Sequence, residues 1–183
     1  MFFGYTLPGT VLSKRFVVLI SPHLVCSIER KHAYVKEATQ KGEHPMSTEE
    51  NKALARRLIE ETWNQGNLAT VDELMAPGHV GHHSLVPNQP PGRELYKQYI
   101  VRTRTAFPDF HATIEEQIAE GDLVVTRWSV QGTHQGMFRG HSPTGKQMTV
   151  TGIVIDRIVD GKAVEGWMEM DTLHQMQQLG VTP

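Results

Sequence analysis

The spacing of apolar residues changes at Pro108, and this change constrains the fold more than any other feature of the sequence. Before Pro108, apolar side chains recur at the spacing of a helix with one buried face. After Pro108 they alternate with polar side chains, as they do in half-buried strands. Helices that precede a run of strands predict an α+β fold, in which the helices pack on one face of an antiparallel sheet.

Start and stop signals divide the first part of this pattern into helices. Ser47 is a hydroxyl N-cap with Glu50 three residues later, a pairing that begins many helices. The segment His79–Pro91, rich in histidine, proline and asparagine, is expected to form a loop. We therefore expect helices from Ser47 to Gly66, from Thr70 to Met75 and from Gly92 to Pro108.

The second part of the pattern predicts strands joined by glycine turns. Asp160-Gly161 is a strong hairpin signal, because both residue types tolerate positive φ. Gly121-Asp122 and Ser142–Gly145 mark two further turns. The strands are expected at His111–Ala119, Leu123–Thr133, Lys146–Val159 and Ala163–Met170.

Composition excludes several classes of protein. The 183 residues carry a formal net charge of -2, whereas a nucleic-acid-binding protein needs a basic face. No apolar run approaches the roughly 20 residues that a membrane helix needs. Cys26 is the only cysteine, so no disulfide can form within one chain, and we expect a cytoplasmic protein. The sequence also lacks phosphate-loop, dinucleotide-binding and Ser-His-Asp signatures.

The first 45 residues differ from the rest of the chain. They hold six Lys and Arg against three Asp and Glu, and an apolar run ends early at Ser21-Pro22. That run is too short for the roughly 7–15 residues of a signal-peptide core. We expect Met46 to be the true start, followed by a single domain at residues 46–183. A targeting segment and a structural extension are the alternatives for residues 1–45.

A series of motifs then follows in a fixed order. It reads Phe107–Phe110, Glu120–Val125, Arg127-Trp128, Gly132–Gly136, Gly140, Thr144–Lys146, Arg157, Asp160–Lys162, Glu165–Trp167 and Asp171. The series resembles the SnoaL-like polyketide and ester cyclases, within the cone-shaped α+β superfamily of ketosteroid isomerase and the nuclear transport factor. The resemblance covers about Met46 to Gly180. It implies N-terminal helices packed on a strongly curved antiparallel or mixed sheet, a cone-shaped α+β barrel with a central hydrophobic pocket.

The resemblance also implies which side chains face that pocket. The family places the residue after the last tryptophan inside, and alternation turns every second side chain of a strand the same way. The family usually has an acid at the position of Met168 and a histidine near Val154, so the pocket wall is predicted to be apolar here. The predicted lining is Val150, Val154, Met168 and Met170, with Met137 and Phe138 over the mouth.

Asp171 and His134 are candidate catalytic residues. Asp171 precedes residues at helical spacing, so it is either a helix N-cap or a pocket acid or base with a pKa raised by burial, and the roles are compatible. His134, in the segment Gly132–Gly136, is either a general acid or base, or a turn residue bonded to a backbone carbonyl.

Three histidines gather in the segment after the second helix. His79, His82 and His83 have no cysteine and no clear carboxylate beside them, so a metal site is not expected. The resemblance places this segment across the pocket mouth. We therefore expect His82 or His83 to face the pocket as a further catalytic candidate.

The outer face of the sheet is a candidate dimer interface. Alternation places Trp167 on this face together with either Arg127 or Trp128. Exposed aromatic side chains on an open sheet are usually covered by a partner. We therefore expect a homodimer.

Three functional classes agree with these features. The first is a cofactor-free enzyme that uses acid–base chemistry for aldol-type cyclisation or isomerisation of a small hydrophobic carbonyl compound. The second is a non-catalytic binder of small apolar ligands, which the apolar residues Met168 and Val154 favour. The third is a structural or regulatory dimer. The fold alone does not decide among them, and the enzyme is our working hypothesis.

Overall fold

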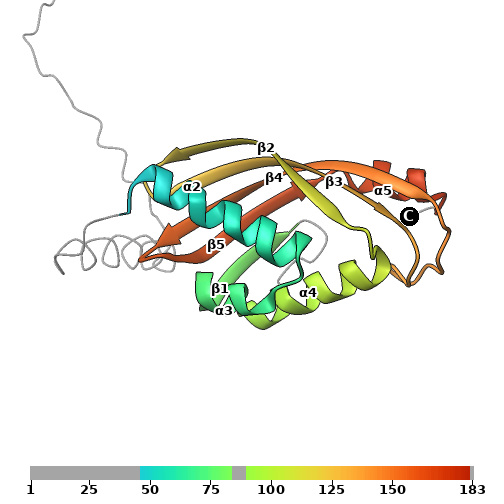
Figure 1. Cartoon of the computed structure of the whole chain (residues 1–183), viewed down its shortest axis with the longest axis horizontal. Coiled ribbons are helices and arrows are strands. Elements are labelled where there is room, and N and C mark those ends of the chain that lie inside the picture. The colour runs from blue at the N-terminus through green and yellow to red at the C-terminus, as the bar shows by residue number, and fades with distance from the viewer. Residues whose placement is uncertain (1–45, 84–89, 182–183) are drawn as a thin grey trace, which may run out of the picture. The chain divides into compact units, whose positions relative to one another are not determined.

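The computed structural model describes residues 46–83 and 90–181 (Figure 1). The predicted leader, residues 1–45, lies outside the described residues. None of the helices in the described part is long and apolar enough to cross a membrane. The elements are α2 (Thr48–Arg57), the π-helix η1 (Leu58–Asn64), α3 (Leu68–Leu74), β1 (Met75–His83), α4 (Arg93–Ala106), β2 (His111–Glu120), β3 (Leu123–Thr133), β4 (Gln147–Val159), β5 (Lys162–Met170) and α5 (Thr172–Leu179).

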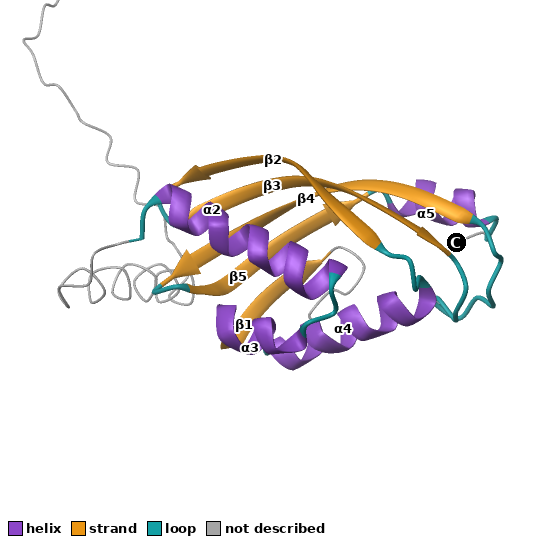
Figure 2. Ribbon diagram, in the orientation of Figure 1, coloured by secondary structure: helices purple, strands orange, loops and turns teal. Residues whose placement is uncertain are grey.

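Helices α2, α3 and α4 lie on one face of a curved sheet, which confirms the predicted α+β fold (Figure 2). The capping box is present at Ser47, whose Oγ accepts from the Glu50 amide while its own amide donates to the Glu50 carboxylate. The helix expected from Ser47 to Gly66 has two parts, because α2 passes directly into η1. The Thr62 hydroxyl donates to the Leu58 carbonyl inside η1, a contact that competes with regular helical bonding.

The sheet has five strands in the order β1-β5-β4-β3-β2. The four strands predicted after Pro108 are confirmed and pair antiparallel with their neighbours along the chain. Bulges interrupt the register between Ile114 and Glu116 and between Arg157 and Ile158. Such bulges increase local twist and bend a sheet.

The loop expected at His79–Pro91 is wrong for its first residues, which belong to strand β1. This strand pairs parallel with β5, with Val80 opposite Glu165 and His83 opposite Met168. Pro77, which cannot donate to a ladder, lies where the register shifts between Met75 and Val80, at the edge of the sheet. A parallel pairing between segments far apart in the chain leaves no local signal in the sequence.

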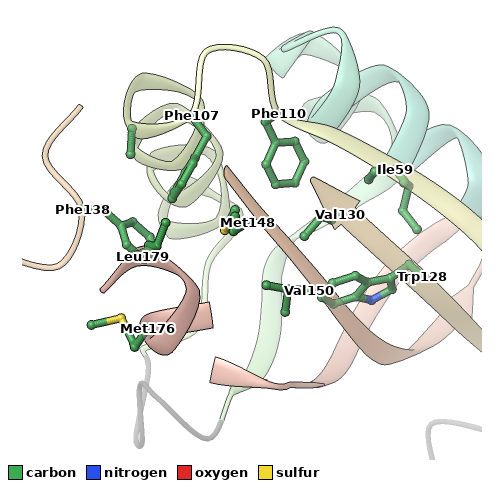
Figure 3. Close-up of a cluster of buried hydrophobic side chains, with 12 residues drawn as sticks. Ile59, Phe107, Phe110, Trp128, Val130, Phe138, Met148, Val150, Met176 and Leu179 are labelled. Atoms are coloured by element: carbon green, nitrogen blue, oxygen red, sulfur yellow. The ribbon is translucent and has the colours of Figure 1, made fainter. Parts of the chain in front are cut away.

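Two hydrophobic clusters fill the space between the helices and the sheet. One cluster lies around Leu58, Val71 and Ile100, beneath α2, α3 and α4. The other includes Phe107 and Phe138, which lie against Leu179 of α5, as Figure 3 shows. Helix α5 therefore closes one end of the core over β4.

Asp171 is the N-cap of α5. Its Oδ1 accepts a hydrogen bond from the His174 amide at 2.9 Å, and its side chain is exposed. At the other end of α5, Gly180 has φ 70°, the left-handed conformation that commonly ends a helix. The capping role predicted for Asp171 is confirmed.

Replacing this cap is expected to destabilise the protein in proportion to the lost hydrogen bond. Asp171→Ala should reduce the free energy of unfolding by about 1 kcal/mol. Asp171→Asn should cost only a few tenths, because the amide oxygen still accepts and only the favourable charge at the helix start is lost. Urea unfolding of both variants measures the difference, and equal losses would contradict the assigned role.

Candidate functional site

A cavity of about 300 Å³ lies between the inner face of the sheet and helices η1 and α4. This volume is at the lower end of the range for small-molecule sites. The wall is mainly apolar, with Trp63 from η1, Phe110 before β2, Trp128 from β3 and Met168 from β5. Met168 of β5 therefore faces the cavity.

Most of the predicted pocket residues reach this cavity. Val154, Met168, Met170 and Phe138 line it, together with His82 and His83. Val150 does not line the cavity and is buried in the core instead. Met137 does not either, because its neighbour Phe138 takes the inward position and leaves Met137 62% exposed.

His134 and Asp171 are not among the residues that line the cavity. His134 is fully buried, with its ring tilted against Phe107 at 5.4 Å and its Nδ1 3.1 Å from the Thr144 hydroxyl. Its amide donates to the Lys146 carbonyl and its carbonyl accepts from Gly145. The structure therefore places His134 in the turn before β4 and Asp171 at the cap of α5.

Sequence reasoning missed Asp156, which lines the cavity from β4. Asp156 is two residues after Val154 on the same strand, so the alternation that placed Val154 inward also indicates that Asp156 faces inward. No side chain in the described part of the chain forms a hydrogen bond or ion pair with its carboxyl group. Burial without a partner raises the pKa of Asp156 to about 7, because desolvation disfavours the charged form. The wall was predicted to be apolar, and Asp156 is a polar exception in it.

His79 of β1 faces the same space as Asp156. Its Nε2 is buried and has no hydrogen-bond partner among residues 46–83 and 90–181. A Cβ placed on Gly166 would lie 3.3 Å from Asp156 Oδ1 and 3.4 Å from His79 Nε2. The missing side chain of Gly166 thus leaves a point that both groups can reach. Burial lowers the pKa of His79 to about 4, so its imidazole is neutral at pH 7.

Tyr96 of α4 is the third polar group in this part of the cavity. The Trp63 indole donates to its hydroxyl at 2.7 Å, and the His79 ring lies 6.3 Å from its ring. Burial raises the pKa of Tyr96, and the nearby Asp156 carboxyl raises it further, so the phenol keeps its proton. We call Asp156, His79 and Tyr96 the polar cluster.

The polar cluster combines groups suited to proton transfer near neutral pH. Asp156 can exchange a proton because its pKa lies close to 7, and the phenol of Tyr96 can donate a hydrogen bond. Perturbed titratable groups in a cavity are typical of functional sites. In the same described residues, no three His, Cys, Asp or Glu side chains converge to hold a metal ion.

His82 and His83 occupy different environments at the cavity. His82 is exposed, stacks on Trp167 at 5.2 Å and has its Nε2 3.0 Å from the Glu165 carboxylate. His83 packs edge-on against Tyr99 at 6.1 Å, and burial lowers its pKa. The catalytic role predicted for these histidines stays a prediction.

The raised pKa of Asp156 predicts how stability depends on pH. Between about pH 4 and 7 the folded protein keeps a proton that the unfolded chain releases, so stability falls as pH rises. Asp156→Asn lacks this term, so the stability of the wild type relative to the variant should fall by at most about 4 kcal/mol across this range. Denaturant unfolding at several pH values measures it. His79, whose pKa is lowered, makes stability rise with pH, but it does so equally in the wild type and in the variant. A stability difference between the two proteins that does not change with pH would contradict the raised pKa of Asp156.

Comparisons with known proteins agree with this architecture. The family model for the SnoaL-like polyketide cyclases matches residues 53–179. No protein with a curated description matches the sequence. TsrD from Streptomyces laurentii is similar in structure, with a TM-score of 0.67 and 26% identity over 74% of this chain and 98% of that one. IdmH from Streptomyces antibioticus, a candidate polyketide cyclase, has a TM-score of 0.63 and 35% identity over 72% of this chain and 99% of that one. AclR from Streptomyces galilaeus, a candidate hydroxylase, has a TM-score of 0.65 and 29% identity over 73% of this chain and 83% of that one. The chain belongs to the SnoaL-like polyketide cyclase family.

Proposed function

We propose that this protein catalyses a cofactor-free acid–base reaction, an aldol-type cyclisation or isomerisation, on a small hydrophobic carbonyl compound. One observation carries the proposal. An unpaired carboxyl group with a pKa near 7 and an unpaired imidazole nitrogen converge over Gly166 inside an apolar cavity. Keeping both groups without partners costs stability, so their persistence favours a ligand that pairs with them.

The polar cluster supports a simple sequence of proton transfers. The carboxylate of Asp156 removes a proton α to a carbonyl, and the electron pair moves to the carbonyl oxygen to form an enolate. The Tyr96 phenol donates a hydrogen bond to that oxygen. In a cyclisation, the enolate carbon bonds to a second carbonyl carbon of the same molecule. Asp156 then returns its proton to the new alkoxide, so the enzyme ends unchanged.

The apolar wall supplies the rest of the proposed catalysis. Trp128 and Met168 offer a substrate apolar surface beside the polar cluster. A substrate folded against this wall brings its two carbonyl groups together, and such proximity contributes several kcal/mol to catalysis.

A non-catalytic binder is the second candidate. The apolar residues at Met168 and Val154, where the family resemblance implies an acid and a histidine, favour it. A binder would hold the same ligands but would leave their α-protons unexchanged. Proton exchange therefore separates the two functions without knowledge of the product.

Replacing Asp156 tests the enzyme directly. A thermal-shift screen of aromatic polyketides, steroids and terpenes selects ketones that bind, and NMR in D₂O follows exchange of their α-protons. Asp156→Asn should slow exchange about 10² or more, with little change in affinity, as expected for a positioned general base. The wild-type rate should rise with pH through about 7, as the carboxyl ionises.

Two further variants make this test specific. Gly166→Ala fills the point between Asp156 and His79 and should slow exchange as well. Asp171→Asn, which alters the cap of α5, should leave the rate unchanged. Ligand binding with no exchange by the wild type would favour the binder, and a rate loss confined to Asp171→Asn would return the catalytic role to that residue.

We further propose a homodimer through the outer face of the sheet. Trp128 points inward to the cavity, so Arg127 rather than Trp128 shares the outer face of the sheet with Trp167. A row of apolar residues crosses this face from strand to strand, and each residue is paired in the sheet with the next one. The row consists of Ile118, Val125, Ile155 and Trp167. Ile153 beside the row is 46% exposed and Ile118 is 66% exposed, so a partner would remove considerable apolar surface from water.

A charge on this face is expected to separate the subunits. Ile153→Lys should convert a dimer to a monomer at micromolar concentration, because a lysine in an apolar contact loses its hydration. Val101→Lys on α4 is a matched control, since Val101 is similarly exposed at 49% on a different element. Light scattering measures the mass of each protein, and a monomeric wild type would reject the proposal.

A further inference from the structure

Arg139 occupies a backbone position that arginine rarely adopts. Residues Phe138 and His141 exchange backbone hydrogen bonds of 3.1 and 2.9 Å across a two-residue turn. Arg139 and Gly140 both have positive φ, 49° and 83°, as a type I′ turn requires. Asn, Asp and Gly are the usual residues there, because a longer side chain is strained in this conformation. Strain of this kind is often kept where a side chain has a function.

The Arg139 guanidinium lies near residues that line the cavity. Its Cζ lies 5.3 Å from the ring centroid of Phe138, which lines the cavity wall. Its positive charge acts on two further lining residues: it opposes the rise that burial causes in the pKa of Tyr99, and it adds to the burial that lowers the pKa of His83. Arg139 therefore lies beside the part of the cavity that Phe138, Tyr99 and His83 enclose.

Arg102 brings a second positive charge to the part of the cavity that Phe138, Tyr99 and His83 enclose, which we call the rim. It lies three residues after Tyr99 on α4, lines the cavity and is exposed. Arg57, Arg93, Arg127 and Arg157 each form a salt bridge, whereas Arg102 and Arg139 form none with any carboxylate in the described ranges. The exposed Glu169 also acts on His83 and opposes the lowering of its pKa. Within the described ranges, neither guanidinium of the rim is therefore paired with a carboxylate.

The rim is separate from the polar cluster. His83 is the register partner of Met168, two residues along β5 from Gly166, or about 7 Å at the rise of a strand. Tyr99 lies three residues beyond Tyr96 on α4, about 4.5 Å along the helix axis. A ligand that spans both regions would place an anionic end at the arginines and a carbonyl group at Asp156.

We infer that Arg139 and Arg102 bind a carboxylate, so that the substrate is a keto acid whose apolar body fills the cavity between the arginines and the polar cluster. Arginine suits this role because its planar guanidinium forms paired hydrogen bonds with a carboxylate. The inference rests on the proposed function for the reaction and adds the class of substrate. Arg139 acts here as a specificity-determining residue, since it holds the end of the substrate remote from the reacting atoms.

A matched pair of ligands tests this inference. Anthraquinone-2-carboxylate and its methyl ester have the same ring system but differ in charge. Calorimetric titration of the full chain at low salt should show the carboxylate binding about tenfold tighter or more, a difference of about 1.4 kcal/mol. Higher salt should reduce the preference, because exposed charges are screened.

Substitution of Arg139 separates charge from folding. Arg139→Asn removes the charge but suits the positive φ, so the turn and the fold should persist and the preference for the carboxylate should fall close to one. Arg102→Gln should reduce the preference in part. Arg56→Gln removes a charge from the exposed face of α2 and should leave it unchanged.

Three results would overturn the inference: equal affinity for acid and ester in the wild type, a preference that survives Arg139→Asn, or binding of neither ligand. The proton-exchange assay measures a rate that depends on Asp156, whereas this titration measures a difference in affinity that depends on Arg139. A carboxylate preference without α-proton exchange would therefore reject the proposed enzyme and keep the anion site. Exchange without any carboxylate preference would do the reverse.

Discussion

The pleat of β4 is the constraint on which the cavity depends. Its inward positions follow one another from the closed end of the core to the polar cluster: Met148, Val150, Gly152, Val154 and Asp156. A Cβ at Gly152 would lie 2.3 Å from the Trp128 ring, so the indole occupies the place of the absent side chain. Met148, Val154 and Asp156 line the cavity, whereas Val150 between them is buried in the core. A shift of register by one would turn Asp156 to the outer face.

The polar cluster is costly to keep in such a wall. A carboxyl group loses hydration on burial and gains no partner in return, which is why the pKa of Asp156 rises to about 7. The pKa of His79 falls for the same reason, so at neutral pH the imidazole is uncharged and Asp156 exchanges its proton readily. The same environment thus raises the pKa of Asp156 and lowers the pKa of His79, and acid–base chemistry needs two groups with pKa values shifted apart in this way.

Local signals in the sequence predicted the parts of this structure that local physics determines. The capping box at Ser47, the hairpin at Asp160-Gly161 and the alternation after Pro108 each depend on neighbouring residues, and each is present. Strand β1 was missed because its ladder to β5 joins distant segments, and its Pro77 and histidines resemble a loop. The inward direction of Trp128 rather than Arg127 likewise follows from packing that alternation alone does not choose.

Asp156 was missed for a different reason, which bears on the proposed mechanism. The resemblance directed attention to Met168 and Val154, and both positions are apolar. These two residues are register partners, and the next inward pair along the same two strands is Asp156 opposite Gly166. Diagonal neighbours of this kind lie about 7–8 Å apart, so a carboxyl group at Asp156 enters the same cavity as one at position 168 would. Glycine at 166 then leaves open the space into which that carboxyl points. Under the proposed function, the acid has moved by one pleat to the adjacent strand, and the loss of an acid at Met168 does not by itself imply the loss of catalysis.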